Sequence, residues 1–579
     1  MCGIAVILTK KRREEAPIEA MVRSLEHRGP DHLDTVNAGN QIALGHTRLK
    51  ILDLSDRANQ PVYSPDGRYV MVFNGEVYNY IELREQLIGY DFKTSSDTEV
   101  VLAAYIRWGK AALDKFNGMF SFVVWDTKAK TLFAARDRFG VKPLFYAFHQ
   151  GDLYIASEIK ALFEAGVPRR ENEAVWAEYL CFGTYPDPDR SFWEGIQPLA
   201  GGHYMVADTE HFGVERWYDF VQGVNTVKAY DWTDEQWQEQ YEALLDETVR
   251  LRFRSDVPVG INLSGGLDSG LLLGLIKRQN RDIGGLDAFT FISGDARYDE
   301  LPWVEQMISH TQCRLTPVAL TPEDIPGLAI EVQRAQDEPF GGFPTLAYSN
   351  LFRRAHQKGI TVILDGQGLD EQWAGYSYYR NIDPSKFHIG PVQGSISSPV
   401  RPSVLKEDFR KMAQPRTFPR PFGDALRDLQ YRDIFYTKIP RALRFNDRIS
   451  MMYSTELREP FLDYRMVEMG VAAPDRLKIR EGEQKWLLRR IGEHIIPKGV
   501  AQAPKRPVQT PQREWLKGAL KGWAEEMIEV ALEGFGGTWL DPALLQAEWR
   551  AYQNKEMDNS FFIWQWINIG LWLKTKNNK

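Results

Sequence analysis

The sequence predicts two domains, an α+β domain in residues 2–205 and an α/β domain in residues 235–579, joined by a polar linker at 206–234. A chain of 579 residues is too long for one hydrophobic core, which favours at least two domains. Short strand-like runs dominate the first part, as in an α+β domain with substantial sheet. In the second part, helices alternate with apolar strands at spacings suited to parallel crossovers, and the C-terminal part is helical.

Strand-like runs and helical patterns organise the first part. Turn residues such as Pro65-Asp66-Gly67 separate some of the strands. The helical patterns lie at Pro17–His27 and Ile81–Leu87. The strands are expected at Ile4–Leu8, Ile42–Thr47, Tyr69–Phe73, Met119–Trp125, Thr131–Arg136 and Asp152–Ser157.

In the second part, a helix at Glu235–Arg252 leads into a strand at Val257–Leu263, a glycine-rich turn and another helix. Further strands are expected at Ala288–Ile292 and Thr361–Leu364, each after a helical segment. Near the C-terminus, the aromatic stretch Phe561–Trp572 could form a membrane or partner helix. Its modest basic flanks favour a buried packing helix instead.

The bulk composition favours a cytoplasmic protein that acts on small molecules. A net charge of −7 and a pI near 5.9 argue against a broad basic surface for nucleic acid or for anionic membranes. The cysteines Cys2, Cys181 and Cys313 have no spacing typical of a disulfide framework or a zinc site. The apolar N-terminal stretch is too short for a signal peptide, and no apolar run approaches the roughly 18 residues that a membrane span needs.

Cys2 is a candidate nucleophile because of its position. Methionine aminopeptidase removes Met1 readily when a small residue follows, so we expect a mature chain that begins Cys2-Gly3-Ile4. The free α-amine, with an unperturbed pKa of about 7.7 to 8.0, can then take the thiol proton directly or through a water. One residue would supply both nucleophile and base. The alternative is that Cys2 is an incidental small hydrophobe.

Five sequence blocks follow one another in the first part of the chain. They are Cys2-Gly3-Ile4, His27-Arg28-Gly29-Pro30-Asp31, Gly45-His46-Thr47-Arg48-Leu49, Phe73-Asn74-Gly75-Glu76-Val77-Tyr78-Asn79 and Ser96-Asp97-Thr98-Glu99. Together they resemble the ordered signature of class II glutamine amidotransferases. The resemblance implies an α+β N-terminal-nucleophile hydrolase domain with an αββα sandwich.

The resemblance also implies roles for the polar residues of these blocks. Arg48 should bind the α-carboxylate of glutamine, since a guanidinium can make a bidentate pair. Asp97, with Glu76 nearby, should receive the α-ammonium. The Asn74 side-chain amide and the Gly75 backbone N–H should form the oxyanion hole for the tetrahedral intermediate. Taken alone, the Asn-Gly pair would favour a hairpin turn, and the two acids would be solvated surface charges.

A strand-to-helix junction at Val259–Ser269 carries the turn Ser264-Gly265-Gly266-Leu267-Asp268-Ser269. Backbone N–H groups and the positive end of the following helix make an anion site there, and the glycines let phosphates approach closely. No Gly-Lys-Ser/Thr follows, so it is not a Walker A loop. It resembles the pyrophosphate loop of ATP pyrophosphatases, although a bare Ser-Gly-Gly would be an ordinary turn. The ATP-binding residues that the resemblance implies are Leu263, Ser264, Gly265, Gly266, Leu267, Asp268, Ser269, Ile292, Asp365 and Gly366.

A second junction, Val362–Glu371, supplies another carboxylate cluster. Mg²⁺ is usually held by one or two protein carboxylates with phosphate and water, so Asp268 and Asp370 are expected to bind it. The segment resembles the acidic loop of asparagine synthetases, with Gln367 in place of a glutamate. A neutral amide cannot act as a general base, so incoming ammonia would need another proton acceptor.

Segments farther along the chain resemble the same family. Leu443–Met451 and Glu456–Asp463 resemble its helical substrate region, and Glu483–Arg489 matches the segment whose lysine faces pyrophosphate and the acyl centre. Lys485 is therefore expected to stabilise negative charge there, although a helix lysine by itself is usually a surface residue.

The resemblance to glutamine-hydrolysing asparagine synthetases spans nearly the whole chain. It implies an ATP-pyrophosphatase-type second domain, with ATP and Mg²⁺ as cofactors. Ammonia released from glutamine would pass through a sheltered route to an acyl-adenylate. Aspartate is the expected acceptor. Gln367 and the sequence Tyr376–Asn381, which lacks the family's His-Lys-Ala-Pro pattern, leave open another carboxylate, on a sugar uronic acid, a peptide or a natural-product precursor.

Two further hypotheses remain, a protein of a different class and a synthetase of a different kind. A binding or regulatory protein without synthetase activity is disfavoured by the intact Asp268, Asp370 and Lys485. A synthetase that uses intramolecular amines is disfavoured by Cys2. No nucleic-acid or membrane partner is expected, and a homodimer is expected from the family alone.

Overall fold

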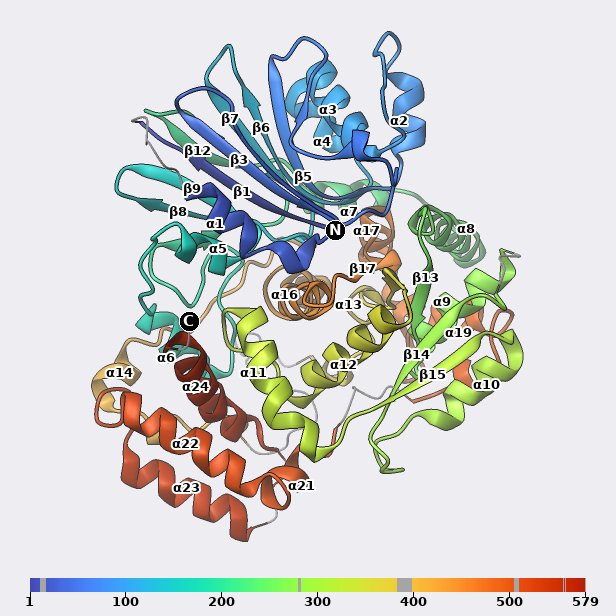
Figure 1. Ribbon diagram of the computed structural model, residues 1–579. Coiled ribbons are helices and arrows are strands. Elements are labelled where there is room, and N and C mark those ends of the chain that lie inside the picture. The colour runs from blue at the N-terminus through green and yellow to red at the C-terminus, as the bar shows by residue number, and fades with distance from the viewer. Residues whose placement is uncertain are drawn as a thin grey trace.

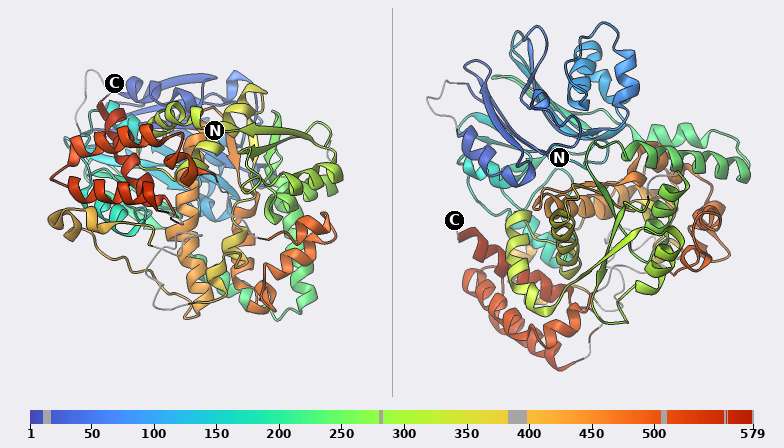
Figure 2. Two further views of the ribbon diagram at one scale, coloured as in Figure 1. Left: turned by 90° about the horizontal axis from the view of Figure 1, so that it is seen from below. Right: turned by 45° about the vertical axis from the view of Figure 1, so that its right-hand side comes forward.

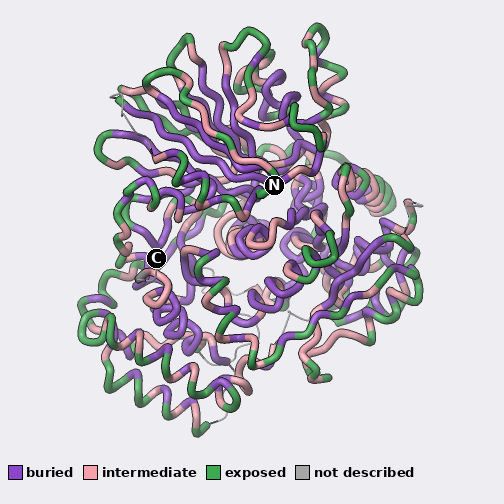
Figure 3. The backbone as a smooth tube through the Cα atoms, viewed as in Figure 1, coloured by how far each residue is buried: buried purple, intermediate pink, exposed green. Residues whose placement is uncertain are grey.

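The structure is a computed structural model that describes residues 1–10, 17–279, 283–382, 398–504, 510–555, 557 and 559–577. A β-sandwich forms one end of the molecule, and a parallel sheet surrounded by helices forms the other (Figure 1). We name them the sandwich domain (β1 to β12) and the parallel-sheet domain (β13 to α24). The N-terminus lies where the two meet, within a region of buried chain (Figures 1 and 3).

The first sheet of the sandwich is antiparallel, with the strand order β10-β8-β9-β1-β3-β2. Its central strands are buried throughout because helices cover one face and the second sheet covers the other. Burial on both faces explains why the sequence of β1 is continuously apolar. The strands are β1 (Cys2–Leu8), β2 (His32–Asn37), β3 (Ile42–Arg48), β8 (Phe145–His149), β9 (Asp152–Ala156) and β10 (Ile196–Pro198).

The second sheet is also antiparallel, in the order β12-β11-β7-β6-β5-β4. Ile4 and Val6 of the first sheet share a core with Val72 and Trp125 of the second. Helices α1 and α5 pack on the outside of the first sheet, and α3 packs on the outside of the second. The predicted αββα layers are thus confirmed. The elements are β4 (Val62–Tyr63), β5 (Tyr69–Val77), β6 (Gly118–Asp126), β7 (Thr131–Arg136), β11 (His203–Ala207), β12 (Phe212–Arg216), α1 (Ile18–Arg23), α2 (Tyr80–Gln86), α3 (Asp97–Trp108), α4 (Ala112–Lys115), α5 (Ile159–Glu164) and α6 (Glu173–Phe182).

The range 206–234, predicted as a linker, contains the edge strand β12 and the helix α7 (Phe220–Lys228). Phe220 and Val224 of α7 are buried against the parallel-sheet domain, and α7 contacts α17 (Tyr464–Ala472). Helix α8 (Asp234–Arg252) follows with a capping box at Thr233. The chain therefore crosses between the domains in ordered structure, and the exact domain boundaries stay a prediction.

All strands of the third sheet run parallel, in the order β15-β14-β13-β16-β17. Helices α9 and α10 lie on one side of it, and α11 and α12 lie on the other (Figure 1). The direction of strand addition reverses between β13 and β16, which is where ligands bind in open α/β sheets. The elements are β13 (Val259–Asn262), β14 (Asp287–Ile292), β15 (Arg314–Ala319), β16 (Val362–Leu364), β17 (Glu456–Arg458), α9 (Leu267–Arg278), α10 (Leu301–Thr311), α11 (Ile325–Gln336) and α12 (Phe343–Gln357).

Helices make up most of the remaining chain, and those of the C-terminal end, red in Figures 1 and 2, pack on the side of the domain away from α9 and α10. A β-hairpin, β18 (Ile479–Arg480) and β19 (Glu483–Gln484), interrupts them. The helices are α13 (Leu369–Gln372), α14 (Glu407–Lys411), α15 (Ala425–Arg432), α16 (Lys438–Met451), α18 (Asp475–Lys478), α19 (Trp486–Gly492), α20 (Lys498–Ala501), α21 (Gln512–Lys517), α22 (Lys521–Phe535), α23 (Pro542–Asn554) and α24 (Phe561–Asn577).

The aromatic stretch near the C-terminus forms the packing helix that the sequence predicts. Trp564, Trp566 and Trp572 are buried in the core. A Cβ atom on Gly570 would lie 2.1 Å from the carbonyl oxygen of Met527, so this glycine permits the close contact between α22 and α24. Among the described residues, no helix has the length and apolarity needed to cross a membrane.

Candidate active sites

Cys2 lies at the first position of β1, opposite Arg48 in the β1–β3 pair. Its backbone N–H donates a hydrogen bond of 3.0 Å to Oδ1 of Asn74, and only 7% of the residue is exposed. Met1 precedes it, with its amine 3.3 Å from the Glu456 carboxylate. Burial raises the pKa of the Cys2 thiol, so the nucleophile needs a base to become a thiolate near neutral pH.

Asn74 and Gly75 lie within β5 rather than in the hairpin turn that the dipeptide alone would favour. The Asn74 Nδ2 is buried and has no hydrogen-bond partner among the described residues. A Cβ atom on Gly75 would lie 2.2 Å from the carbonyl oxygen of Met119, so only glycine fits against β6. A buried, unpaired amide donor beside Cys2 is suited to hold a developing oxyanion.

Arg48 is anchored by the loop that follows β3. Its NH1 donates to the Ser55 carbonyl at 2.8 Å and to Asn59 Oδ1 at 2.7 Å, and its NH2 donates to the Asp53 carbonyl. Burial lowers the pKa of Arg48, because desolvation disfavours the charged form. These contacts fix the guanidinium in the Cys2 region, and its role toward glutamine stays a prediction.

Glu76 and Asp97 form a pair of buried carboxylates near the same site. Asp97 begins α3 and accepts a hydrogen bond of 2.9 Å from the backbone N–H of Val77. Burial raises the pKa of Asp97 to about 6, and burial together with Asp97 raises the pKa of Glu76 well above its usual range. Glu76 also lies 3.4 Å from the Arg458 guanidinium of the parallel-sheet domain. Two carboxylates held in this way can receive an ammonium group.

The Ser264–Ser269 turn joins β13 to α9, as the sequence predicts. The Ser264 and Ser269 hydroxyls are 2.9 Å apart, and Ser269 Oγ donates to the Ser264 carbonyl at 2.8 Å. The backbone N–H of Gly265 donates to a carboxylate oxygen of Glu300 at 3.3 Å. An anionic oxygen of the protein thus lies against the turn, at the kind of position that a phosphate oxygen takes at a helix N-terminus.

The other residues expected to bind ATP gather around this turn. Asn262, at the end of β13, donates through Nδ2 to Asp365 Oδ2 at 3.0 Å. A Cβ atom on Gly366 would lie 3.0 Å from the backbone nitrogen of Ser269, so the loop after β16 touches the start of α9. Ile292 ends the neighbouring strand β14. The residues therefore meet at the reversal point of the parallel sheet.

Lys485 brings together the two predicted metal ligands. Its Nζ lies 2.7 Å from both carboxylate oxygens of Asp268 and 2.6 Å from Asp370 Oδ1. Lys485 has a φ of 55°, a left-handed conformation that is uncommon outside glycine and is often found at functional sites. Two carboxylates that converge on one point, next to the turn predicted to bind phosphate, fit the ligand set that Mg²⁺ prefers.

Gly375 was not recognised from the sequence, yet it makes this convergence possible. A Cβ atom there would lie 2.0 Å from Asp370 Oδ1 and 2.4 Å from Lys485 Cε. Gln367 is half-buried in the same region, between Gly366 and Gly368. Because contacts across a folded turn leave no local sequence pattern, only the structure identifies Gly375.

Arg458 is a second residue whose role the sequence did not reveal, although its segment was singled out. It is fully buried in β17, and its Nε donates to Glu456 at 2.5 Å. Its guanidinium lies 3.4 Å from Glu76, and its carbonyl accepts a hydrogen bond of 2.9 Å from the backbone N–H of Asp365. One residue thus contacts both candidate sites.

Comparison with known proteins agrees with this geometry. Residues 1–218 match a glutamine amidotransferase domain, and residues 240–574 match the asparagine synthase family. A glutamine-hydrolysing asparagine synthetase of Bacillus subtilis is 28% identical, over 91% of this chain and 90% of its own length. A putative one of Methanocaldococcus jannaschii is 30% identical, over 76% of this chain and 90% of its own length.

An amidase named chry2, of Gibberella zeae, is 26% identical, over 97% of this chain and 95% of its own length. Relatives with different names thus align along almost the whole chain. The asparagine synthase match covers more than half of the chain and contains the site at Lys485, while the amidotransferase match contains the site at Cys2. The chain therefore belongs to the glutamine-hydrolysing asparagine synthetase family.

Proposed function

We propose that this protein is a glutamine-dependent amide ligase that converts aspartate to asparagine and ATP to AMP and pyrophosphate. The observation that carries the proposal is the pairing of two sites in one chain. At one, a buried amide donor without a partner among the described residues lies beside the candidate nucleophile Cys2. At the other, two carboxylates and a lysine converge beside a phosphate-binding turn.

The chemistry at Cys2 is a thioester mechanism. After removal of Met1, the α-amine of Cys2 takes the thiol proton, and the sulfur attacks the side-chain carbonyl of glutamine. Asn74 Nδ2 and the Gly75 N–H stabilise the oxyanion, and the leaving nitrogen takes the proton and departs as ammonia. Water then hydrolyses the thioester to glutamate. Arg48 holds the α-carboxylate, and Asp97 with Glu76 holds the α-ammonium.

The chemistry at the second site is adenylation followed by amide formation. The acceptor carboxylate attacks the α-phosphorus of ATP, pyrophosphate leaves, and ammonia displaces AMP from the acyl-adenylate. Backbone N–H groups of the Ser264–Ser269 turn bind the phosphates, and Lys485 neutralises charge that develops on pyrophosphate and at the acyl centre. Asp268 and Asp370 would hold Mg²⁺, which would supply further neutralisation of the phosphate charge.

The test is pyrophosphate release from ATP and Mg²⁺ with glutamine, scanning aspartate against a panel of other carboxylic acids. We expect release that depends on aspartate and yields asparagine. The Cys2→Ala variant should be inactive with glutamine and active with ammonium, because only the first site is removed. Absence of pyrophosphate release with every acid, in the presence of either nitrogen source, would contradict the proposal.

A second candidate keeps both sites and changes the acceptor. Gln367 is a neutral amide where the asparagine synthetases that the sequence resembles have a glutamate, so the acceptor pocket and its proton transfer differ from theirs. An aromatic group of the buried Tyr376 and Tyr379 and the half-buried Tyr378 follows it in the chain, with ring centroids 4.7 to 5.9 Å apart. Turnover on a sugar acid, a peptide or another metabolite, but not on aspartate, would select this candidate.

A further inference from the structure

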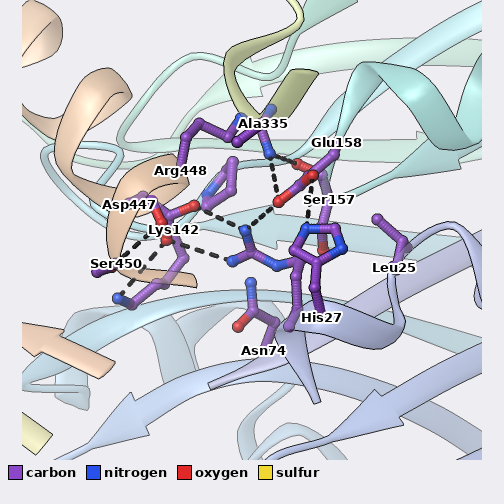
Figure 4. A network of polar contacts seen from close by, with 12 residues as sticks. Leu25, His27, Asn74, Lys142, Ser157, Glu158, Ala335, Asp447, Arg448 and Ser450 are labelled. Atoms are coloured by element: carbon purple, nitrogen blue, oxygen red, sulfur yellow. Dashed lines mark hydrogen bonds and ion pairs between the residues drawn. The ribbon is translucent and has the colours of Figure 1, made fainter. Parts of the chain in front are cut away.

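A buried group of charges, which includes Glu158, Asp447 and Arg448, joins the two domains (Figure 4). At its centre is Arg28, from the His27–Asp31 block of the sandwich domain, with no exposed surface. Its Nε donates a hydrogen bond of 3.0 Å to the carbonyl oxygen of Cys2, and its NH1 donates to Glu158 at 2.6 Å. Arg28 therefore holds the main chain of the candidate nucleophile.

The second partner of Arg28 comes from the other domain. Asp447, on α16, accepts hydrogen bonds from NH1 at 2.9 Å and from NH2 at 3.2 Å. Burial alone would raise the pKa of Asp447, but Arg28 and Lys142 hold it below its usual range. A bidentate, charge-assisted contact of this kind fixes the orientation of a guanidinium as well as its position.

Helix α16 extends from this contact toward the second site. It begins at Lys438, whose Nζ lies 5.1 Å from the ring centroid of Tyr376. The Tyr376 hydroxyl donates at 2.6 Å to Glu371, which follows Asp370 in the chain. One helix thus contacts Arg28 near one end and the surroundings of the adenylation site at the other.

We propose that Asp447 is a positioning residue for the glutaminase site, which fixes Arg28 and, through Arg28, the carbonyl group of Cys2. The inference rests on the proposed glutaminase activity. Because the carbonyl and the thiol belong to the same residue, tilting of this peptide changes the direction from which the sulfur approaches glutamine. A displacement of about 1 Å is enough to cost a large factor in rate. The parallel-sheet domain therefore takes part in arranging a nucleophile that lies in the sandwich domain.

The test compares Asp447→Asn with a control at another contact between the domains. Asp447→Asn keeps the size of the side chain but replaces one carboxylate oxygen, an acceptor, with an amide group that can only donate toward the guanidinium. Glu82→Gln is the control, because Glu82 of α2 binds Arg254 across the domain junction, at 2.7 and 2.6 Å, without contacting Cys2. Glutamate formation from glutamine, ammonium-dependent pyrophosphate release and the rate of Cys2 alkylation by iodoacetamide are measured for each protein.

We expect Asp447→Asn to lower kcat for glutamine hydrolysis by about tenfold, equivalent to about 1.4 kcal/mol, with little change in KM. Its Cys2 should be alkylated at a different rate, and its ammonium-dependent activity should fall by a smaller factor than its glutamine hydrolysis. Glu82→Gln should match the wild type in all three measurements. Asp447→Glu, which is larger but keeps the charge, should recover most of kcat, whereas a purely packing role would make it the worse variant.

Wild-type kcat and alkylation rate in Asp447→Asn would overturn the inference while leaving the glutaminase proposal intact. A wild-type protein that forms no glutamate would overturn the glutaminase proposal, and the alkylation rates would still test the inference. If Asp447→Asn fails to fold, Arg28→Lys is tested in its place. Arg28→Lys removes the same bidentate contact while keeping the positive charge. Its kcat should fall in the same way, and an unchanged kcat would contradict the inference.

Discussion

Glu76 and Asp97 are buried carboxyl groups whose pKa values are raised above their usual range. Burial raises both, even though Arg458 lies 3.4 Å from Glu76. A cation placed between the carboxylates would lower both values, and the α-ammonium of glutamine is such a cation. In the proposed mechanism, the side-chain amide of glutamine would then lie toward Cys2 and toward Asn74 Nδ2, which has no hydrogen-bond partner among the described residues. At the scale of single residues, the proposed glutaminase mechanism therefore assigns the ammonium group of glutamine to these two carboxylates.

Glutamine binding should weaken as the pH falls through about 6, the pKa of Asp97. Above that pH the carboxylate is charged and attracts the ammonium, and below it the neutral acid does not. By linkage, bound glutamine should lower the pKa of Asp97. Calorimetric titration of Cys2→Ala with glutamine on both sides of this pH measures Kd without turnover.

Asp97→Asn should bind glutamine weakly on both sides of that pH, with a flatter profile than the parent variant. Asp91→Asn is a matched control because Asp91 is exposed and pairs only with Lys93 among the described residues. It should keep the parental profile. A Kd for the parent Cys2→Ala protein that does not change across this pH would contradict the assignment of Asp97 to the ammonium.

At the scale of elements, the sequence predicted those strands whose burial leaves a clear apolar pattern. β7 was predicted with the same bounds that the structure shows, and β1, β5, β6 and β16 within a few residues. β12 was missed because all of it is exposed, as expected for an edge strand, so it has no apolar pattern. Helix α3 was missed because its buried run Val100–Ala104 has no polar face to mark a helical period.

The candidate sites could also be predicted only in part. Residues in the two loops after β13 and β16 could be grouped, because neighbouring parallel strands bring their carboxyl ends to one edge of the sheet. The contact of Arg458 with Glu76 could not be predicted, since no local pattern pairs residues of different domains. The same holds for Asp447 and Arg28, although both lie in segments that the sequence analysis had singled out.

Gly375, in the turn after α13, provides a testable prediction at the scale of elements. Gly375→Ala places a methyl group 2.0 Å from Asp370 Oδ1 and 2.4 Å from Lys485 Cε, so both groups must move. We expect ammonium-dependent pyrophosphate release to fall by about 10²-fold or more, because displacement of charged groups at a reacting centre removes transition-state stabilisation. Glutamine hydrolysis, measured as glutamate formation, should persist.

The matched control is Gly522→Ala on α22, where a Cβ atom meets nothing within 4 Å. Alanine is favoured over glycine inside a helix by about 0.5–1 kcal/mol, so this protein should be at least as stable as the wild type and fully active. Wild-type pyrophosphate release by Gly375→Ala would show that Asp370 and Lys485 do not need the close approach that the structure displays.

At the scale of the whole molecule, a buried apolar cluster crosses the junction between the two domains, alongside the buried charges of Arg28, Asp447 and Arg458. Met119 and Ile51 of the sandwich domain belong to one buried cluster with Leu443, Phe461 and Leu369 of the parallel-sheet domain. The cluster thus extends from the segments around Cys2 to the helix that carries Asp370. Ammonia is protonated rapidly in bulk water and then cannot act as a nucleophile. A route along this apolar cluster would exclude water and keep ammonia neutral.

We therefore expect the nitrogen of the amide product to come from glutamine even when ammonium is present in solution. Unlabelled glutamine and ¹⁵N-ammonium would be supplied together near neutral pH, and the product would be analysed by mass spectrometry. Cys2→Ala with ¹⁵N-ammonium alone gives the fully labelled reference. If ammonia instead left the protein between the two sites, it would mix with the labelled pool, and the product would carry the isotope ratio of the solution. Such mixing would mean that the apolar cluster holds the domains together without conducting ammonia between the two sites.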